Sequence, residues 1–328
     1  MALDNVLNRT IDLYHFRPET SIPDLSGKVI IVTGGNIGLG FQSIVQLAPH
    51  NPQKIYLTAR SRTKYDAAMT ELRKGNTSID EVVHFVEMDL SSLASVKKAA
   101  EQILSETDRV DVLMNNAGIM GTSPSLTKDG YEIHFGVNHM GHALLTNLLM
   151  PFLLRTAKQS EVRVVNVSSG AYEMVDPKIG FDEKLVKTDM AKVSGSGGNL
   201  MSRYGTSKLA NVLHARGLAK HYPSVTSVSI APGRVKTTIL DNLYAEGQDK
   251  FYGYFQKFYD IVIGAKTPYD GAFTQVWAAT EPEKARVENG AMYFPVGKKG
   301  PGTKLSNDNA LVDRFWDFTE NELKRLGY

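Results

Sequence analysis

A glycine-rich turn directly after a short apolar strand limits what this chain can fold into more than any other feature. The run KVIIVT (28–33) leads into TGGNIGLG (33–40), and a helical pattern follows. Glycines at 34, 38 and 40 permit a tight turn, and they let backbone N–H groups approach a pyrophosphate at the positive end of the helix. The spacing is TGxxxGxG rather than GxGxxG, so a strand–helix turn that binds no ligand is the alternative.

Short β-branched runs alternate with longer helical patterns along the chain. Helical patterns lie, for example, at 91–106 and 209–222. Near-continuous apolar strands separated by helices are typical of a parallel sheet that is covered on both faces. The sequence therefore predicts an α/β fold, a Rossmann-type doubly wound three-layer sandwich with a mostly parallel seven-stranded sheet. The strands are expected at 28–33, 54–59, 81–88, 109–115, 161–168, 224–231 and 290–296.

The composition excludes several classes of protein. The 328 residues are 42% apolar, enough for a large core, and no linker or repeat divides them, so we expect a single domain over 1–328. The net charge of +2 does not indicate binding to nucleic acid or to an anionic membrane surface. The chain has no cysteine, which excludes disulfides, thiolate nucleophiles and cysteine-ligated metals and favours a soluble, cytoplasmic protein.

Residues 1–25 form an N-terminal extension before the first strand. They lack the long apolar stretch of a signal peptide, and no run in the chain approaches the ~20 apolar residues of a transmembrane segment. Apolar residues are spaced for a short amphipathic helix at Leu3, Val6, Leu7, Ile11 and Tyr14. We expect such a helix to pack on the body of the protein, with a peripheral membrane contact as the alternative.

The residue that follows the second strand predicts which nucleotide the turn would bind. An NAD site needs an acid about 20 residues past the glycines, to bind the ribose 2′-OH. Arg60 lies 20 residues after Gly40, and no Asp or Glu occurs between Gly34 and Tyr65. A guanidinium suits a 2′-phosphate, so Arg60, with a basic residue at 62 or 64 nearby, favours NADP(H) over NAD(H). The alternative is a solvated basic loop.

Seven motifs occur in a fixed order along the chain: TGGNIGLG, MDL (88–90), NNAG (115–118), VNHMGH (137–142), NVSS (166–169), RYGTSK (203–208) and PGRVKT (232–237). Each is weak alone; YxxxK by itself is often an ordinary helix start with a solvated lysine. The ordered set resembles the short-chain dehydrogenase/reductase family from about residue 26 to about 297. SKLANVL (207–213) with Trp316, Glu320 and Leu323 is similar to the retinol-dehydrogenase-like and fungal reductase branch.

The resemblance implies a catalytic set and a cofactor site. Tyr204 would be the general acid/base, with Lys208 as its partner. Ser169 would bind the substrate oxygen, while Ser168 is expected to bond only backbone. Asn138 would hold a proton-relay water, unless it is a helix cap. Cofactor contacts are implied at Gly34, Asn36, Ile37, Gly38, Gly40, Asp89 (adenine), Leu90, Asn116 (adenosine ribose), Ala117, Gly118, Tyr204, Lys208, Pro232, Gly233, Val235 and Thr237.

The implied chemistry explains why a tyrosine and a lysine stand four residues apart. A tyrosine with its usual pKa near 10 is a poor base at pH 7, and lowering that pKa by about three units requires about 4 kcal/mol in favour of the phenolate. An ammonium close by in a low-dielectric cleft, helped by an oxidised nicotinamide, can supply that free energy. On a helix this spacing puts Tyr204 and Lys208 on one face, so we expect Lys208 to lower the pKa of Tyr204.

Three segments extend the family pattern. Ser169 and Tyr204 are 35 residues apart, so residues 170–202 form an insertion that we expect to flank the active site as a lobe or lid. Such an insertion can remove the helix pair that builds tetramers in this family, so a monomer is expected in preference to a homodimer. Residues 238–265 lie where the family covers its substrate, and residues 298–328 form a C-terminal extension.

The substrate-covering segment includes FYGYFQKFY (251–259). These aromatic side chains would suit a lipophilic or aromatic substrate, or they pack on the body of the protein. His139 and His142 could share a helix face, but the sequence offers no third ligand nearby, so no metal is expected.

These observations support one main hypothesis and two alternatives. The main hypothesis is an NADP(H)-dependent oxidoreductase that interconverts a lipophilic or aromatic ketone or aldehyde and its alcohol, with a secondary-metabolite or lipid-like small molecule as substrate. The second is a catalytically silent protein that senses NADP(H), although silent relatives usually lose the tyrosine–lysine pair. The third is a nucleotide-sugar epimerase or dehydratase, which usually has a tighter TGxxGxxG turn.

Overall fold

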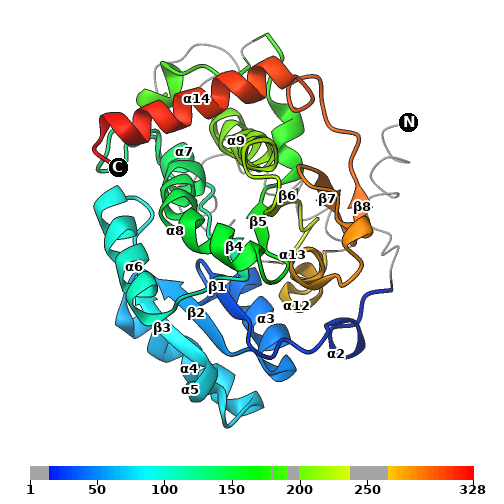
Figure 1. The fold of residues 1–328 in the computed structure, drawn as a ribbon. Coiled ribbons are helices and arrows are strands. Elements are labelled where there is room, and N and C mark those ends of the chain that lie inside the picture. Colours follow the sequence, from blue (N-terminus) through cyan, green and yellow to red (C-terminus); the bar gives the residue numbers. More distant parts are fainter. Residues whose placement is uncertain (1–14, 179, 191–198, 237–264) are drawn as a thin grey trace.

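A computed structural model describes residues 15–178, 180–190, 199–236 and 265–328. Eight strands form one sheet in the order β3-β2-β1-β4-β5-β6-β7-β8, and every neighbouring pair is parallel except β7 and β8 (Figure 1). The strands are β1 (Val29–Val32), β2 (Lys54–Ala59), β3 (Val83–Glu87), β4 (Val112–Asn115), β5 (Arg163–Val167), β6 (Thr226–Ile230), β7 (Met292–Phe294) and β8 (Lys298–Lys299).

The Rossmann-type fold and the seven expected strands are confirmed, but the expected strand count is wrong by one. Strand β8 pairs antiparallel with β7 through Tyr293 with Lys299 and Phe294 with Lys298. Gly297, with φ of 71°, forms the turn between them. A two-residue strand is too short to show an alternating pattern, which is why the sequence did not predict it.

Helices cover both faces of the sheet (Figure 1). Those on one face are α6 (Leu93–Glu106), α7 (Ile133–Phe135), α8 (Gly141–Ala157), α9 (Leu200–His221) and α14 (Asn309–Arg325); those on the other are α2 (Pro18–Ser21), α3 (Gly38–Leu47), α4 (Arg62–Gly75), α5 (Ile79–Val82), α12 (Pro268–Gly271) and α13 (Phe273–Thr280). Single turns are η1 (Ala48–His50), η2 (Gly136–Met140, a π turn), η3 (Gly170–Met174), η4 (Leu185–Lys187) and η7 (Lys284–Arg286).

The alternation of side chains along β1 divides the core into two layers. Val29 and Ile31 belong to the layer under α6, α8 and α9, whereas Ile30 and Val32 belong to the layer under α3 and α13. All four are buried, as expected for a central strand that is covered on both faces. The strand order reverses between β1 and β4, and open α/β sheets bind their ligands at such a point, outside the carboxyl ends of the strands.

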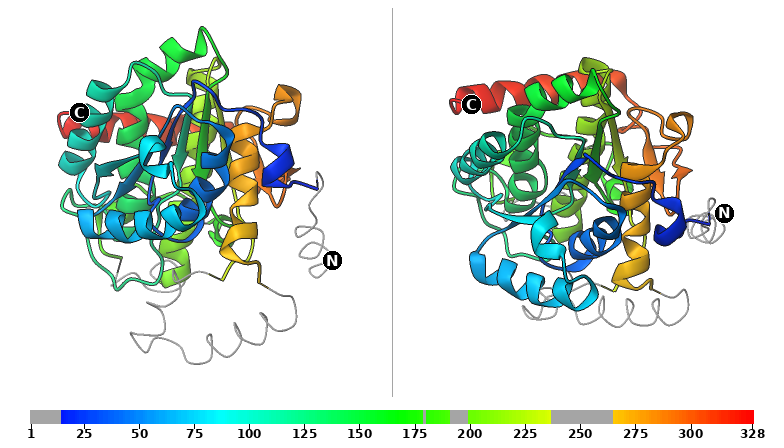
Figure 2. Two further views of the ribbon diagram at one scale, coloured as in Figure 1. Left: turned by 90° about the horizontal axis from the view of Figure 1, so that it is seen from below. Right: turned by 60° about the horizontal axis from the view of Figure 1, so that its bottom comes forward.

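The described part of the N-terminal extension packs on the second layer. Figure 2 shows α2 beside the orange helix α13. The Phe16 and Phe273 rings meet edge to face at 5.6 Å, and the Tyr269 hydroxyl donates a hydrogen bond to Glu19 (2.8 Å). The expected helix at residues 3–14 lies outside the described residues. Within the described ranges, no helix is long and apolar enough to cross a membrane.

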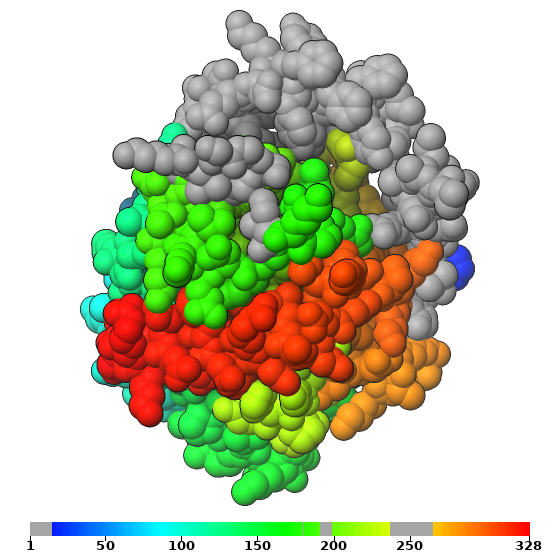
Figure 3. Space-filling model, turned by 90° about the horizontal axis from the view of Figure 1, so that it is seen from above, coloured from blue at the N-terminus to red at the C-terminus, as the bar shows by residue number. Residues whose placement is uncertain are grey.

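The C-terminal extension crosses the surface above α9. In Figure 3 the red α14 lies along the surface between a green part of the chain and the yellow-green end of α9. The Trp316 ring packs so closely on Gly217 that a Cβ there would lie 2.5 Å from it. Phe181, from the insertion, meets the Phe315 ring at 4.8 Å. The insertion, α14 and α9 therefore share one apolar cluster.

Candidate active site

The glycine turn has the backbone that its sequence predicts. Gly34 and Gly38 have φ of 64° and 58°, a backbone conformation that residues other than glycine rarely adopt. A Cβ on Gly40 would lie 2.5 Å from the Gly34 carbonyl oxygen, so this close approach also requires glycine. Helix α3 begins at Gly38, and its first N–H groups lack partners within the helix. The space at Gly38 is open, and Ile37 beside it is exposed, so the turn fits a pyrophosphate.

The Thr33 hydroxyl holds the turn to the NNAG loop. It accepts hydrogen bonds from the backbone N–H groups of Asn116 and Ala117 (both 2.9 Å), while the Asn116 side-chain amide donates to the Thr33 carbonyl oxygen (2.7 Å). The same hydroxyl lies 2.8 Å from His142 Nε2. The sequence reasoning did not single out Thr33, and its partners lie more than 80 residues away in sequence.

The tautomer of His142 follows from its two partners. Its Nδ1 lies 3.0 Å from the Asn138 carbonyl oxygen, which can only accept, so Nδ1 carries the hydrogen and Nε2 accepts from the Thr33 hydroxyl. Complete burial lowers the pKa of His142 to about 4, so the ring is neutral at pH 7. His142 thus links the glycine turn to the backbone at Asn138.

Asn138 lies in the buried π turn η2 and connects the loop after β4 to α9. Its Oδ1 accepts a hydrogen bond from the Ile119 N–H (2.8 Å), and its Nδ2 donates to the Ile119 carbonyl oxygen (3.1 Å) and to Ser207 Oγ (2.9 Å). The neighbouring residue His139 donates to or accepts from Thr319 (3.2 Å) among aromatic rings. The described residues contain no group of three or more potential metal ligands.

Tyr204 and Lys208 lie on one helix, as the sequence predicts. Helix α9 begins at Leu200, nine residues before the helical pattern at 209, and Asn199 caps it through a hydrogen bond from the Ser202 N–H (2.8 Å). Lys208 Nζ lies 5.6 Å from the centre of the Tyr204 ring. Ser169 follows β5, and its hydroxyl is near enough to the Tyr204 side chain to lower the pKa of the phenol. The structure therefore brings Ser169, Tyr204 and Lys208 together.

Burial dominates the electrostatics of the pair in the protein alone. Burial raises the pKa of Tyr204 to about 12, against a smaller lowering by the Ser169 hydrogen bond. Burial also lowers the pKa of Lys208 to about 7, and its Nζ donates to the Val167 carbonyl oxygen (2.9 Å) instead of the phenol. In the protein alone, desolvation therefore dominates the pKa of both groups, and a lowering of the Tyr204 pKa by Lys208 together with an oxidised nicotinamide stays a prediction.

A second serine and a glycine complete the centre of the site. Ser168 Oγ donates to the Lys208 carbonyl oxygen (2.8 Å), so Ser168 bonds backbone, as expected. Ser169 Oγ also accepts from the Ala171 N–H (3.2 Å) at the start of η3. A Cβ on Gly118 would lie 3.3 Å from Lys208 Nζ, so glycine at this position leaves room beside the ammonium.

The other candidate cofactor residues follow the carboxyl ends of successive strands. Arg60 is exposed directly after β2 and makes no hydrogen bond or ion pair with the described residues, whereas Arg62 pairs with Asp66 (2.8 Å). Asp89 follows β3 and accepts hydrogen bonds from the Ser91 N–H (3.0 Å) and hydroxyl (2.7 Å).

Further candidates for the cofactor site lie at the same edge of the sheet. Leu90 packs against Gly141, where a Cβ would lie 2.8 Å from its side chain. Gly233, after Pro232, has φ of 80°, and Val235 forms a parallel bridge with Lys266. Asn36 is partly buried in the glycine turn. Thr237 and the FYGYFQKFY segment lie outside the described residues.

Gln275 on α13 is a second residue that the sequence did not reveal. Its Nε2 donates to Asn116 Oδ1 (3.0 Å) and Ser43 Oγ (2.7 Å), and the residue is fully buried. It therefore joins α3 to the NNAG loop behind the glycine turn. No local sequence pattern indicates these contacts, because a glutamine within an apolar helical segment predicts only a buried polar residue.

Apolar side chains gather around the Tyr204 ring. Met120, Ala171 and Tyr204 form one buried cluster, and Met201 packs against it. These residues come from the loop after β4, from η3 and from the first turns of α9. Apolar side chains therefore cover part of the Tyr204 ring.

Comparisons with known proteins agree with this geometry. Residues 28–179 match the family model described as short chain dehydrogenase. The chain is 35% identical over 319 residues to the short-chain dehydrogenase/reductase drtF of Aspergillus calidoustus, covering 93% of this chain and 96% of that protein. It is 32% identical over 312 residues to retinol dehydrogenase 14 of Homo sapiens, covering 90% of this chain and 86% of that protein.

A solved structure extends the likeness to the fold. The crystal structure of an uncharacterized protein from Mycobacterium paratuberculosis aligns with a TM-score of 0.69 at 24% identity, covering 94% of this chain and 97% of that one. The sequence relatives include fungal reductases and a retinol dehydrogenase, so the resemblance to that branch is confirmed. The chain belongs to the short-chain dehydrogenase/reductase family of oxidoreductases.

Proposed function

We propose that this chain is an NADP(H)-dependent carbonyl reductase that interconverts a lipophilic or aromatic ketone or aldehyde and its alcohol. The observation that carries the proposal is the proximity of Ser169 to the buried Tyr204 and Lys208 at the carboxyl edge of the sheet, where the glycine turn also fits a pyrophosphate. A secondary-metabolite or lipid-like molecule is the proposed substrate. A cytoplasmic location stays a prediction.

The chemistry of each residue follows from its surroundings. Bound NADP(H) supplies the hydride for reduction of the carbonyl carbon. The Tyr204 hydroxyl, protonated at neutral pH because its pKa is about 12, gives its proton to the developing alkoxide. The Ser169 hydroxyl donates a hydrogen bond to the same oxygen. At pH 7 the phenol is thus in the protonated form that carbonyl reduction requires, whereas alcohol oxidation would require the phenolate.

Supporting positions around the catalytic pair have distinct proposed roles. Asn138 holds the loop after β4 against α9, close to where a relay water would meet Lys208. The NNAG residues and the segment after β6 would line the cofactor. Because Met120, Ala171 and Met201 surround the phenol, an apolar substrate group is favoured over a charged one. We also propose that the chain is a single domain and that residues 170–202 flank the active site.

Cofactor choice is tested by Arg60→Ala. Loss of a charge-assisted hydrogen bond to the 2′-phosphate costs about 1.5–3 kcal/mol, so we expect the KM for NADPH to rise about 10- to 150-fold. The KM for NADH should change less than threefold. Arg62→Ala is the matched control, because Arg62 already pairs with Asp66 at 2.8 Å. Equal increases in the KM for NADPH and the KM for NADH in Arg60→Ala would show that Arg60 does not bind the 2′-phosphate.

A ketone panel tests the reaction against the two alternatives. Purified protein is mixed with NADPH and chemically diverse ketones and aldehydes, and cofactor absorbance is followed. We expect consumption with apolar members of the panel and little with phosphorylated or acidic ones. Tight NADPH binding without consumption across the panel would favour the sensor, and turnover of a nucleotide sugar without net cofactor change would favour the epimerase.

The position of α14 supports a monomer. The helix packs along α9 through Trp316, and Lys220 at the end of α9 pairs with Asp313 (2.5 Å), so α14 occupies the surface that a second copy would need to pair α9 with itself. Light scattering on the full chain is expected to give a mass near 36.1 kDa. A stable mass of twice or four times that value would contradict the proposal.

A further inference from the structure

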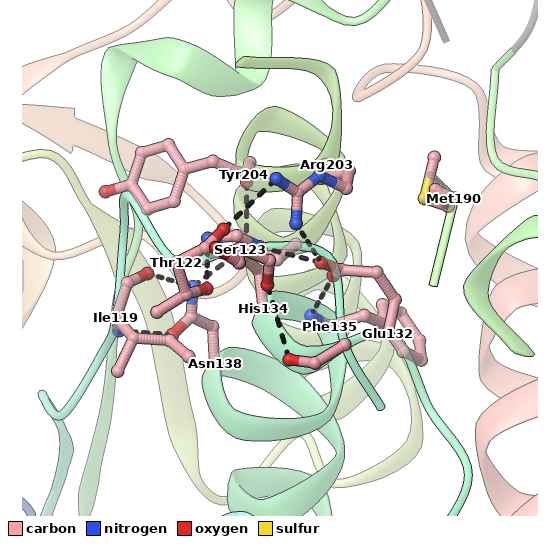
Figure 4. Close-up of polar contacts among 12 residues, drawn as sticks. Ile119, Thr122, Ser123, Glu132, His134, Phe135, Asn138, Met190, Arg203 and Tyr204 are labelled. Carbon is pink, nitrogen blue, oxygen red and sulfur yellow. Dashed lines mark hydrogen bonds and ion pairs between the residues drawn. The ribbon is translucent and has the colours of Figure 1, made fainter. Parts of the chain in front are cut away.

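A buried arginine stands directly before the candidate catalytic tyrosine. The Arg203 side chain is 3% exposed, and its guanidinium makes two contacts with the loop that follows β4 (Figure 4). One nitrogen lies 3.3 Å from Glu132 Oε1, and another donates a hydrogen bond to the Thr122 carbonyl oxygen (3.1 Å). Glu132 is 1% exposed and 71 residues away in sequence. The pair therefore joins the first turn of α9 to a distant segment.

The carboxylate of Glu132 is fully engaged. Its Oε1 also accepts from His134 Nδ1 (2.7 Å), and its Oε2 accepts from the Phe135 N–H (2.8 Å) at the start of α7. His134 Nε2 lies 3.2 Å from the Thr122 hydroxyl, so the histidine spans the carboxylate and the same loop residue that Arg203 contacts. Arg203, Glu132, His134 and Thr122 form a closed polar network, drawn in Figure 4.

This network touches the candidate catalytic side chain itself. The His134 ring meets the Tyr204 ring edge to face, with centroids 6.2 Å apart and planes at 77°. Ala171 and Met120 also pack against Tyr204. The phenol is thus held by His134 and by this apolar cluster, while its hydroxyl is left for Ser169.

A stabilising role alone does not account for a buried ion pair here. Desolvation of two charges cancels most of their attraction, and a well-packed apolar pair is often as stable. A planar guanidinium with two fixed acceptors does, however, define a direction, which an apolar contact does not. Misplacement of a reacting group by about 1 Å can cost about a hundredfold in rate.

We propose that Arg203 is a positioning residue for Tyr204, held by Glu132 and supported by His134. The network sets the rotation of the first turns of α9 and the orientation of the phenol ring toward Ser169. This inference rests on the proposed function, since it assumes that Tyr204 is the proton donor. It predicts that neutralising the pair without unfolding the protein still slows the reaction.

The test separates positioning from stability with two variants. Arg203→Met leaves the Glu132 carboxylate buried without its cation, so both the melting temperature and kcat should fall. Adding Glu132→Gln removes that charge while its amide oxygen keeps an acceptor for the Phe135 N–H. In the double variant we expect the melting temperature to recover at least half of its loss, kcat to stay about 10- to 100-fold below wild type, and the KM for NADPH to stay within twofold.

Arg163→Met is the matched control. Arg163 is also 3% exposed and is bonded to the Ala278 and Glu281 carbonyl oxygens (3.2 and 3.0 Å), but it starts β5, at the end of the sheet opposite the site. The Arg163→Met variant should have a lower melting temperature than wild type, and its kcat should stay within twofold of the wild-type value. If kcat of the double variant returns to wild type together with its stability, Arg203 is only structural and the proposal fails.

A measurement without turnover keeps the two proposals distinguishable. With [13Cζ]tyrosine labelling, the Tyr204 resonance is the one absent from the spectrum of Tyr204→Phe. We expect it to shift or broaden in the double variant and to keep its position in Arg163→Met. An unchanged resonance would overturn the positioning role. Absence of turnover in the wild-type protein across the ketone panel would instead count against the proposed function alone.

Discussion

Tyr204→Phe is expected to lower kcat for carbonyl reduction by about 10²–10⁴-fold, the usual contribution of a general acid. The substitution removes one oxygen and leaves a ring of the same shape among Met120, Ala171 and the His134 ring. The fold and the cofactor site should therefore persist. Initial rates from NADPH absorbance, with NADPH affinity from fluorescence titration, measure the two effects separately, and affinity should stay within about threefold.

Tyr172→Phe serves as its control. Tyr172 is also buried, and its backbone N–H donates a hydrogen bond to the Ser169 carbonyl oxygen. It is therefore a second buried tyrosine close to Ser169. It has Asp176 rather than a lysine four residues on. We expect kcat within about fivefold of wild type. Retention of most turnover by Tyr204→Phe would show that the proposed mechanism is wrong.

Lys208→Met is expected to make the ligand-free protein more stable while abolishing most of its activity. Burial lowers the pKa of Lys208 from 10.5 to about 7, so the folded state holds this ammonium at a cost. Methionine fills a similar volume without charge. The Val167 carbonyl oxygen keeps a donor, because Asn211 Nδ2 also bonds it (3.0 Å). Turnover should fall at least about 100-fold, since the cation beside the phenol is lost.

The pH dependence of this gain has a defined sign. Below pH 7 the lysine is protonated in both the folded and the unfolded chain, so the whole burial cost is present, and we expect the variant to be about 2–4 kcal/mol more stable. Between pH 7 and 10.5 the unfolded state binds more protons than the folded state, so wild-type stability rises with pH and the advantage of the variant shrinks. Above pH 10.5 it vanishes.

Urea unfolding of both proteins at pH 6, 8 and 10 measures the difference. Lys98→Met, which replaces an exposed lysine of α6, should show no such trend. A variant less stable than wild type at pH 6, or an advantage that does not change with pH, would contradict the burial of a costly charge at position 208.

Local patterns in the sequence were enough for the sheet, and the ordered motifs of the family supplied the centre of the candidate site. Near-continuous apolar runs located β1 to β7, and the helical spacing of Tyr204 and Lys208 placed them on one helix face. The parallel order then put Ser169, the glycine turn and Arg60 at one edge of the sheet. What the sequence could not show depends on distant contacts, as with His142 and Thr33, which are 109 residues apart.

Burial and distant contacts explain what else the sequence could not show. The pKa of Tyr204 depends on how much water the folded chain excludes, and no four-residue spacing contains that quantity. The ion pair of Arg203 and Glu132 joins two unremarkable positions across 71 residues. A two-residue strand such as β8 owes its existence to the edge of β7 rather than to its own residues.

The contrast between Thr33 and Arg60 has a consequence for how such a protein can change. Thr33 is buried and shared by the glycine turn, the NNAG loop and His142, so a substitution there disturbs several parts at once. Arg60 stands exposed at the end of β2, outside that hydrogen-bonded framework. Under the proposed role of Arg60, the preference between the two nicotinamide cofactors would therefore change with a substitution at one exposed position and with little loss of stability.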